Sequence, residues 1–175
     1  MNEVTPIVNK VAQSGLITLN LEDFLPSKQV VELDLKQYLF KELLLREKDF
    51  RQSIKEHDWA QYEGKNLAVF CSSDAIIPMW AYMLVATNAE EYADFVAVGN
   101  QQEVTEILLR QNIQKNLDKD GLTDQKVIIK GCGDKPISAG AYLEVSRLLK
   151  PIVRSLMYGE ACSTVPIYKK KRPKV

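Results

Sequence analysis

Three cysteines and a single histidine are the residues of this chain with the most reactive side chains. Cys71 and Cys132 each follow a short apolar run and precede small residues, an aspartate and a proline, whereas Cys162 lies in another loop of small residues. Three thiolates and the imidazole of His57 would form a tetrahedral donor set that suits zinc. The same thiolates with an open fourth position could instead hold iron or an iron–sulfur cluster.

The spacing of these residues is a weakness of the metal hypothesis. The sequence contains neither a Cys-x-x-Cys nor a His-x-x-x-His pair, so every ligand would come from a different segment. A free cysteine is also often only a small buried hydrophobic residue. A zinc or iron site therefore requires the fold to bring all four residues to one place.

A cysteine nucleophile is a second hypothesis. Cys71 precedes a predicted helix, whose free N–H groups and dipole would favour a thiolate. His57 could serve as the base, with Asp58 or Asp74 as the group that orients it. Against this, Pro78 places the start of the helix several residues beyond Cys71, which weakens the effect of the dipole.

A third hypothesis is a site for a small molecule or an anion without covalent chemistry. Gly131-Cys-Gly-Asp-Lys135 supplies two glycines and a lysine just before a helix that Ser138 can cap, and these are components of an anion site. The stretch matches neither a Walker loop nor a GxGxxG fingerprint. The residues expected to bind the ligand are Ser72, Ser73, Gly131, Gly133, Lys135 and Ser138.

Composition and charge exclude several classes of protein. The chain has 175 residues, 46% hydrophobic and 26% charged, which is typical of one soluble globular domain. No apolar run approaches the roughly 18 residues that span a membrane, and the N-terminus lacks the features of a signal peptide. We therefore expect a cytoplasmic protein that does not associate with membranes, in which the cysteines are thiols or metal ligands.

The formal net charge of zero conceals an asymmetry. Five of the 23 basic residues lie between Lys169 and Lys174, which leaves 18 basic residues against 23 acidic ones. An acidic body argues against a nucleic-acid-binding face. The tail, residues 169–175, is similar to a nuclear-localisation or polyanion-binding tract, and the alternative is a disordered, solubilising terminus.

The apolar runs predict an α/β fold. Strands are expected over Leu67–Phe70, Asp94–Val98 and Lys126–Lys130, with helical segments after them, which indicates a mainly parallel central sheet flanked by helices. If these strands are parallel, the turns that hold Cys71 and Cys132 open on the same edge of that sheet. Residues 1–168 would form one domain, and no internal repeat is visible.

Other patterns predict the ends of the elements. Residues 1–35 are expected to form a small β/α extension in which Leu16–Leu21 pairs with Val30–Leu35. Capping-box spacings are present at Asp49 with Gln52 and at Asn100 with Glu103. After Ser138 an apolar stripe that reaches Leu156 predicts a long helix, which Pro151 should kink or divide and Gly159 should end.

Several longer strings resemble a known family. The strings are His57–Trp59, Cys71–Pro78 with Trp80–Met83, Lys130–Cys132, and Gly159–Pro166, and together they are similar to a bacterial family catalogued as domain of unknown function 2480. The resemblance covers nearly the whole chain. It implies a bacterial, cytoplasmic origin, which argues against nuclear import by the tail, and it implies no activity, cofactor or catalytic residue.

The sequence therefore predicts a cytoplasmic α/β protein with a polar, cysteine-containing site at the carboxyl edge of its sheet. The leading hypothesis is that this site binds a small molecule or a metal, zinc or iron. The alternatives are a thiol enzyme that uses Cys71, with Asp74 and His57 as further catalytic candidates, and a non-enzymatic interaction protein that uses the basic tail. Homo-oligomerisation is left open.

Overall fold

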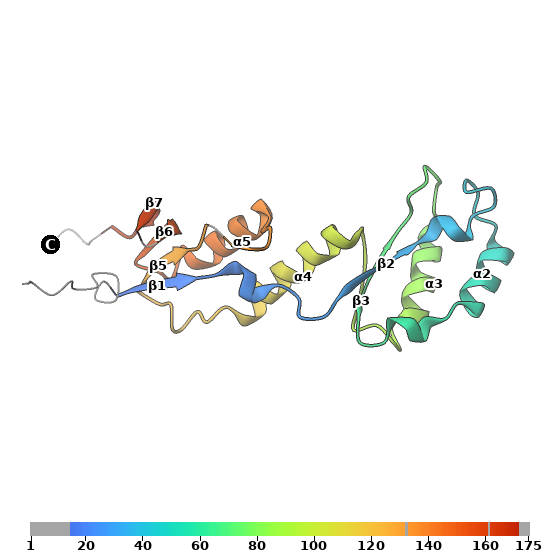
Figure 1. Cartoon of the computed structure of the whole chain (residues 1–175), viewed down its shortest axis with the longest axis horizontal. Coiled ribbons are helices and arrows are strands. Elements are labelled where there is room, and N and C mark those ends of the chain that lie inside the picture. Colours follow the sequence, from blue (N-terminus) through green and yellow to red (C-terminus); the bar gives the residue numbers. More distant parts are fainter. Residues whose placement is uncertain (1–14, 132, 161, 172–175) are drawn as a thin grey trace, which may run out of the picture. The chain divides into compact units, whose positions relative to one another are not determined.

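The chain divides into two compact units, each of which contains a sheet and helices (Figure 1). The computed structural model describes residues 15–131, 133–160 and 162–171. Unit 1 combines the segment that ends at Leu25 with the segment that begins at Leu109, and unit 2 consists of Pro26–Leu108. The predicted α/β class is confirmed. Among the described residues, four of the five pairs of neighbouring strands are parallel, as the apolar runs indicated.

Unit 1 is built on a four-stranded sheet in the order β1-β5-β6-β7. The strands are β1 (Leu16–Leu19), β5 (Lys126–Ile129), β6 (Ser155–Glu160) and β7 (Ser163–Lys169). The first three are parallel, and β7 runs antiparallel to β6. A short 3₁₀ helix, η1 (Leu21–Phe24), follows β1, and α5 (Ala139–Leu149) joins β5 to β6. The apolar face of α5 packs on the sheet, because Ala141, Val145 and Leu149 are fully buried.

Unit 2 is built on a three-stranded parallel sheet in the order β2-β3-β4. Its elements are β2 (Val30–Asp34), η2 (Leu35–Tyr38), α2 (Glu47–Glu56), η3 (Trp59–Tyr62), β3 (Asn66–Phe70), α3 (Met79–Ala89) and β4 (Phe95–Val98). Leu67 and Val69 pack with α2 and α3 in the main core, whereas Ala68, which points to the other face, packs with Val104 and Leu108. Both faces of β3 are therefore buried.

The helix α4 (Gln101–Asn116) has residues in both units. Its predicted capping box is confirmed. The N–H of Glu103 donates to Oδ1 of Asn100 at 3.0 Å, and the N–H of Asn100 donates to Oε2 of Glu103 at 2.8 Å. These two bonds satisfy backbone donors that the helix itself leaves free.

The two units share one structural motif, a repeat that was not predicted from the sequence. In unit 1 the motif consists of β1 and η1 and, later in the chain, β5, α5 and β6. In unit 2 it consists of β2 and η2 and, later in the chain, β3, α3 and β4. The residues of β1 and η1 correspond to those of β2 and η2 with an offset of 14, and the residues of β5, α5 and β6 correspond to those of β3, α3 and β4 with an offset of 60. Unit 2 is thus inserted in sequence between the two segments of unit 1.

The strand register and the turns support this correspondence. Leu16 is paired with Lys126 in unit 1, and Val30 is paired with Asn66 in unit 2, which is the same register after the two offsets are applied. Asn20 and its counterpart Asp34 both cap the 3₁₀ helix with a side-chain oxygen. Few residues are identical between the copies, among them Tyr82 with Tyr142 and Gly99 with Gly159. The two units therefore correspond more clearly in geometry than in sequence.

The strands form two sheets, which corrects two of the sequence predictions. The strands predicted in the N-terminal extension exist, but β1 pairs with β5 and β2 pairs with β3, so the two do not pair with each other. Residues 1–14 of that extension lie outside the described residues. The strands before Cys71 and Cys132, β3 and β5, belong to different sheets, so the prediction that their turns share one sheet edge is wrong.

Two helix predictions are also wrong. The helix α2 begins at Glu47 with Arg46 as its N-cap, so Asp49 and Gln52 do not form a capping box. The helix α5 ends at Leu149, because Pro151 cannot continue it, and Leu156 lies in β6. Gly159 is inside β6 with φ +118°, and a Cβ there would collide with the carbonyl of Ser163.

The C-terminal segment is partly ordered. Lys169 ends β7, and the N–H of Lys170 donates to the carbonyl of Arg154 at 2.9 Å, so the described structure continues into the predicted basic tail. Residues 172–175 of that tail lie outside the described residues. Among the described helices, none combines the length and the apolar character needed to cross a membrane.

Candidate functional site

A cleft of about 400 Å³ opens at the carboxyl ends of β1 and β5 in unit 1. Its walls come from the turn after β1, the loop between β5 and α5, the first half of α5, and β6. The lining residues are Asn20, Leu21, Glu22, Lys130, Gly131, Gly133, Lys135, Pro136, Ile137, Tyr142 and Tyr158. We call this the unit 1 cleft. Its position, beyond the carboxyl ends of parallel strands, is where open α/β sheets bind ligands.

Two tyrosines fix the start of the loop after β5. The hydroxyl of Tyr142 donates to the carbonyl of Lys130 at 3.2 Å, and the hydroxyl of Tyr158 donates to the carbonyl of Gly131 at 3.3 Å. The two rings meet edge to face, with their centroids 5.6 Å apart. A Cβ on Gly131 would lie 2.7 Å from Cζ of Tyr158, so only glycine allows the ring to approach this closely.

Glu22 holds the same loop from the other side. Its Oε1 accepts the N–H of Lys135 at 2.9 Å. A Cβ on Gly133 would displace this carboxylate, so the second glycine of the loop leaves the space that Glu22 occupies. The two glycines predicted to bind a ligand thus let a ring and a carboxylate approach the backbone of the loop.

Two lysines bring positive charge to the unit 1 cleft. Lys130 is half-buried and Lys135 is exposed. In the part of the chain that the structure describes, neither of them forms an ion pair. Ser138 caps α5 as predicted, since its Oγ accepts the N–H of Ala141 at 3.1 Å. The cleft therefore combines the start of a helix with two ammonium groups that form no ion pair with any described residue.

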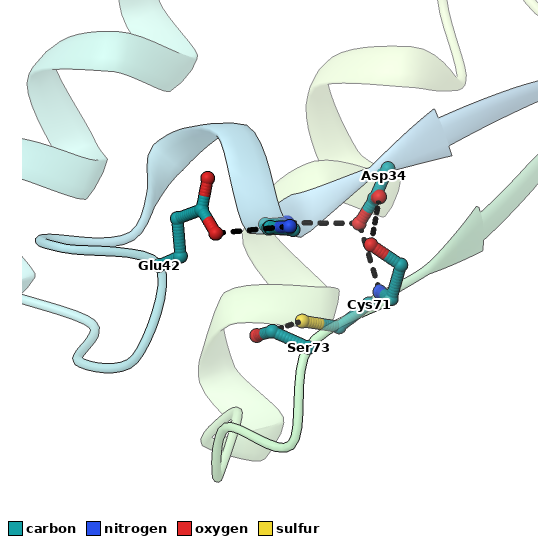
Figure 2. A network of polar contacts seen from close by, with 6 residues as sticks. Asp34, Glu42, Cys71 and Ser73 are labelled. Carbon is teal, nitrogen blue, oxygen red and sulfur yellow. Dashed lines mark hydrogen bonds and ion pairs between the residues drawn. The ribbon is translucent and has the colours of Figure 1, made fainter.

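The corresponding edge of unit 2 holds a polar cluster around Asp34, at the carboxyl ends of β2 and β3 (Figure 2). The carboxylate of Asp34 accepts the N–H of Ser72 at 3.0 Å, the hydroxyl of Ser72, and the N–H of Lys36 at 2.9 Å. Burial opposes ionisation of Asp34, but these hydrogen bonds outweigh it and lower the pKa of the carboxyl below its usual value. Asp34 therefore ties the turn after β3 to the turn after β2.

Cys71 and Lys36 belong to this cluster. The Sγ of half-buried Cys71 lies 3.3 Å from Oγ of Ser73. The ammonium of Lys36 forms an ion pair with Oε2 of Glu42 at 2.9 Å. This contact is the main reason why the pKa of Lys36 is raised, and the nearby Cys71 makes a smaller contribution in the same direction. The predicted ligand residue Ser72 is exposed and is already hydrogen-bonded to Asp34.

His57 forms hydrogen bonds with two tyrosines and, through its Nε2, a longer one of 3.4 Å with Nε2 of Gln61. Its Nδ1 lies 2.8 Å from the hydroxyl of Tyr38, and its Nε2 lies 3.0 Å from the hydroxyl of Tyr62. Partial burial lowers the pKa of His57, and the charge of Asp58 offsets this shift only in part. Burial also raises the pKa of Tyr38 to about 12, so its hydroxyl keeps its proton at neutral pH. This arrangement gives no support to His57 as the base for Cys71.

The predicted metal ligands gain no support from the geometry. Cys71 follows β3 in unit 2, whereas Cys162 is exposed in the turn between β6 and β7 of unit 1. Cys132 lies outside the described residues. Among the residues that are described, no three of His, Cys, Asp and Glu gather so that they could hold a metal ion. Asp74, the other catalytic candidate, is exposed in the turn before α3.

Sequence reasoning missed the residues that shape both edges. Glu22, Tyr142 and Tyr158 in unit 1 and Asp34 and Lys36 in unit 2 were not predicted. A signal for three of them, Glu22, Asp34 and Lys36, was present, because Leu19-Asn-Leu-Glu-Asp-Phe-Leu25 and Leu33-Asp-Leu-Lys-Gln-Tyr-Leu39 share one pattern. In this pattern a short polar cap is followed by a 3₁₀ turn and an aromatic residue, so Glu22 and Lys36 occupy equivalent positions.

The contact between Glu22 and the loop after β5 can be tested by a double-mutant cycle. Glu22→Ala removes the acceptor of the Lys135 N–H and should cost about 1–2 kcal/mol in the free energy of unfolding. Gly133→Ala should cost about 1–3 kcal/mol through overpacking against the carboxylate. In the double variant the loss should be smaller than the sum, because the alanine methyl no longer meets Glu22. Urea unfolding measures all three, and strictly additive losses would contradict the contact.

The single histidine allows its pKa to be measured directly. A ¹H NMR titration of the folded protein should place the midpoint of His57 below about 6.5, and the chain unfolded in urea supplies the control near that value. Because the folded pKa is the lower one, the fold loses stability as the pH falls from the unfolded value through the folded pKa. This pH-dependent loss should be reduced in His57→Gln. A folded midpoint at or above that of the unfolded chain would show that burial does not dominate.

The comparisons with known proteins identify the family. A family model described as "Protein of unknown function (DUF2480)" matches residues 5–170. No curated protein and no solved structure matches the chain. The family match includes every strand and helix among the described residues, and it confirms the resemblance drawn from the sequence strings. The chain is a member of the DUF2480 family.

Proposed function

We propose that this protein binds a small anionic molecule in the unit 1 cleft. The observation that carries the proposal is the position of Lys130 and Lys135, which line one cleft at the carboxyl ends of parallel strands and have no acidic partner there among the described residues. An ammonium group that has no partner in a recess favours a carboxylate or a phosphate.

The other walls of the cleft suit a ligand of small size. The rings of Tyr142 and Tyr158 supply apolar surface, and their hydroxyls hold the backbone of Lys130 and Gly131 in place. A volume of about 400 Å³ lies within the range of small-molecule sites. The carboxylate of Glu22 is engaged by the N–H of Lys135. Glu22 thus positions the loop, and the lysines provide the attraction for the anion.

Calorimetric titration with inorganic phosphate, pyrophosphate and citrate tests the proposal and distinguishes phosphate from carboxylate ligands. We expect at least one of these anions to bind, and Lys130→Ala and Lys135→Ala each to weaken its affinity by about tenfold or more, since each variant removes one charged hydrogen bond. Lys119→Ala is the matched control, because Lys119 is an exposed lysine of the same unit in the loop between α4 and β5. Equal affinities of the wild type and the Lys130→Ala/Lys135→Ala variant would refute the proposal.

A thiol site at the unit 2 edge is a second candidate, favoured by the surroundings of Cys71. The residue occupies the position that corresponds to Gly131, next to the hydroxyl of Ser73 and near the ammonium of Lys36. This candidate retains the predicted nucleophile Cys71 without the predicted base His57.

Alkylation rates decide whether Cys71 is reactive. With iodoacetamide near neutral pH, we expect Cys71 to react faster than Cys162 although Cys162 is the more exposed of the two. Lys36→Met should slow the reaction of Cys71 and leave that of Cys162 unchanged, as followed by peptide mass spectrometry. If Lys36→Met leaves the rate of Cys71 unaltered, the ammonium does not activate the thiol.

A further inference from the structure

The unit 1 cleft has an aromatic corner in addition to its lysines. Tyr142 and Tyr158 both line the cleft, and their ring planes stand at 78° to each other. The hydroxyl of Tyr142 donates to the carbonyl of Lys130, and the hydroxyl of Tyr158 donates to the carbonyl of Gly131. A tyrosine hydroxyl has a single donor, and these bonds use it, so neither hydroxyl can donate to an anion. What the two tyrosines offer to a ligand is the surface of their rings.

The comparison of the two units indicates that this corner is particular to unit 1. With the offset of 60 that relates β5, α5 and β6 to β3, α3 and β4, the counterpart of Tyr142 is Tyr82, and the counterpart of Tyr158 is Val98. The two lysines of the cleft likewise correspond to uncharged residues of unit 2. The second ring and the positive charge therefore occur together, in the same unit and in the same cleft.

The cleft is larger than an anionic group alone would fill. A phosphate or carboxylate beside the lysines would occupy only the charged part of a volume of about 400 Å³. Sites of this size commonly bury a ligand against apolar and aromatic walls, with a few polar groups that fix its orientation. Tyr158 is 39% exposed, and Pro136 and Ile137 add further apolar surface to the lining. A ligand that fills the cleft carries an apolar portion as well as an anionic group.

The charge of the lining also restricts the ligand. Lys130 and Lys135 contribute two positive charges and Glu22 one negative charge, which gives the lining a formal net charge of +1. This balance suits a molecule with one anionic group. The additional charges of a compact polyanion would be repelled by the carboxylate of Glu22.

We propose that the ligand of the unit 1 cleft is an aromatic anion, in which one molecule carries a flat ring and one phosphate or carboxylate group. The inference rests on the proposed anion site and adds the chemical class of its ligand. The anionic group lies beside Lys130 and Lys135, and the ring packs against Tyr142 and Tyr158. Contacts between aromatic rings are favourable beyond the apolar area that they bury, so a flat ring is preferred over a saturated ring of similar size.

Calorimetric titrations with matched anions separate the contribution of the ring from that of the charge. Phenyl phosphate is compared with cyclohexyl phosphate, and benzoate with cyclohexanecarboxylate, so that the two anionic groups are tested independently. In at least one pair we expect the aromatic member to bind about threefold to tenfold more tightly. Equal affinities within both pairs would overturn this inference and leave the anion site standing. If none of these anions binds, and inorganic phosphate does not bind either, the anion site is refuted together with the inference.

Variants of Tyr158 test the ring directly. Tyr158→Leu should abolish the preference for the aromatic member of the pair, whereas Tyr158→Phe, which loses only the hydroxyl, should retain it. Tyr92→Leu in unit 2 is the matched control and should retain the preference, because Tyr92 is exposed to a similar extent, 37%, and lies outside the unit 1 cleft. Circular dichroism and melting temperatures check the fold of each variant. A preference that persists in Tyr158→Leu, or that is lost in Tyr158→Phe, would contradict a contact between this ring and the ligand.

Discussion

Parallel pairing between strands that are distant in sequence is the constraint on which the whole structure depends. Because β1 joins β5 and β2 joins β3 in parallel, the turns after both strands of each pair lie at one edge of the sheet. The backbone groups beyond those ends need new partners. The side chains of Asn20 and Asp34 accept backbone N–H groups of the 3₁₀ helices. Glu22 and Asp34 also accept a backbone N–H from the loop that follows the neighbouring strand. The polar chemistry of both edges arises from this requirement.

The shared motif explains why the two edges are alike in backbone geometry, and the side chains at equivalent positions explain why they differ in chemistry. The positions that carry Glu22, Gly131 and Lys135 in unit 1 carry Lys36, Cys71 and Ala75 in unit 2. In one copy the loop after the second strand provides the positive charge, and in the other the 3₁₀ helix provides it. The unit 1 cleft accordingly suits an anion, whereas the unit 2 edge presents a thiol beside a lysine. The two units thus carry different side chains at equivalent positions of one backbone arrangement.

Local patterns in the sequence predicted the elements well, and the pairing of distant strands much less. Apolar runs and the Asn100–Glu103 spacing identified β3, β4, β5 and the start of α4, because such signals depend on neighbouring residues. The distribution of strands over two sheets depends on long-range register, which no local pattern encodes. For the same reason the glycines of the unit 1 cleft were found, but Tyr158, which reaches the loop from another strand, was not. The turns that contain Cys71 and Cys132 do occupy nearly equivalent places, as the sequence indicated. They follow corresponding strands of two different sheets and do not share one sheet edge.

A ¹⁵N NMR titration of the protein with inorganic phosphate and citrate tests the central claim, that the unit 1 cleft is an anion site, most directly. We expect the amide shifts to concentrate at Glu22, in residues 130–135 apart from Cys132, and at the start of α5, and the amides at the edge of unit 2 around Asp34 and Cys71 to stay unchanged. Shifts that are spread over surface lysines elsewhere, or that centre on unit 2, would contradict it.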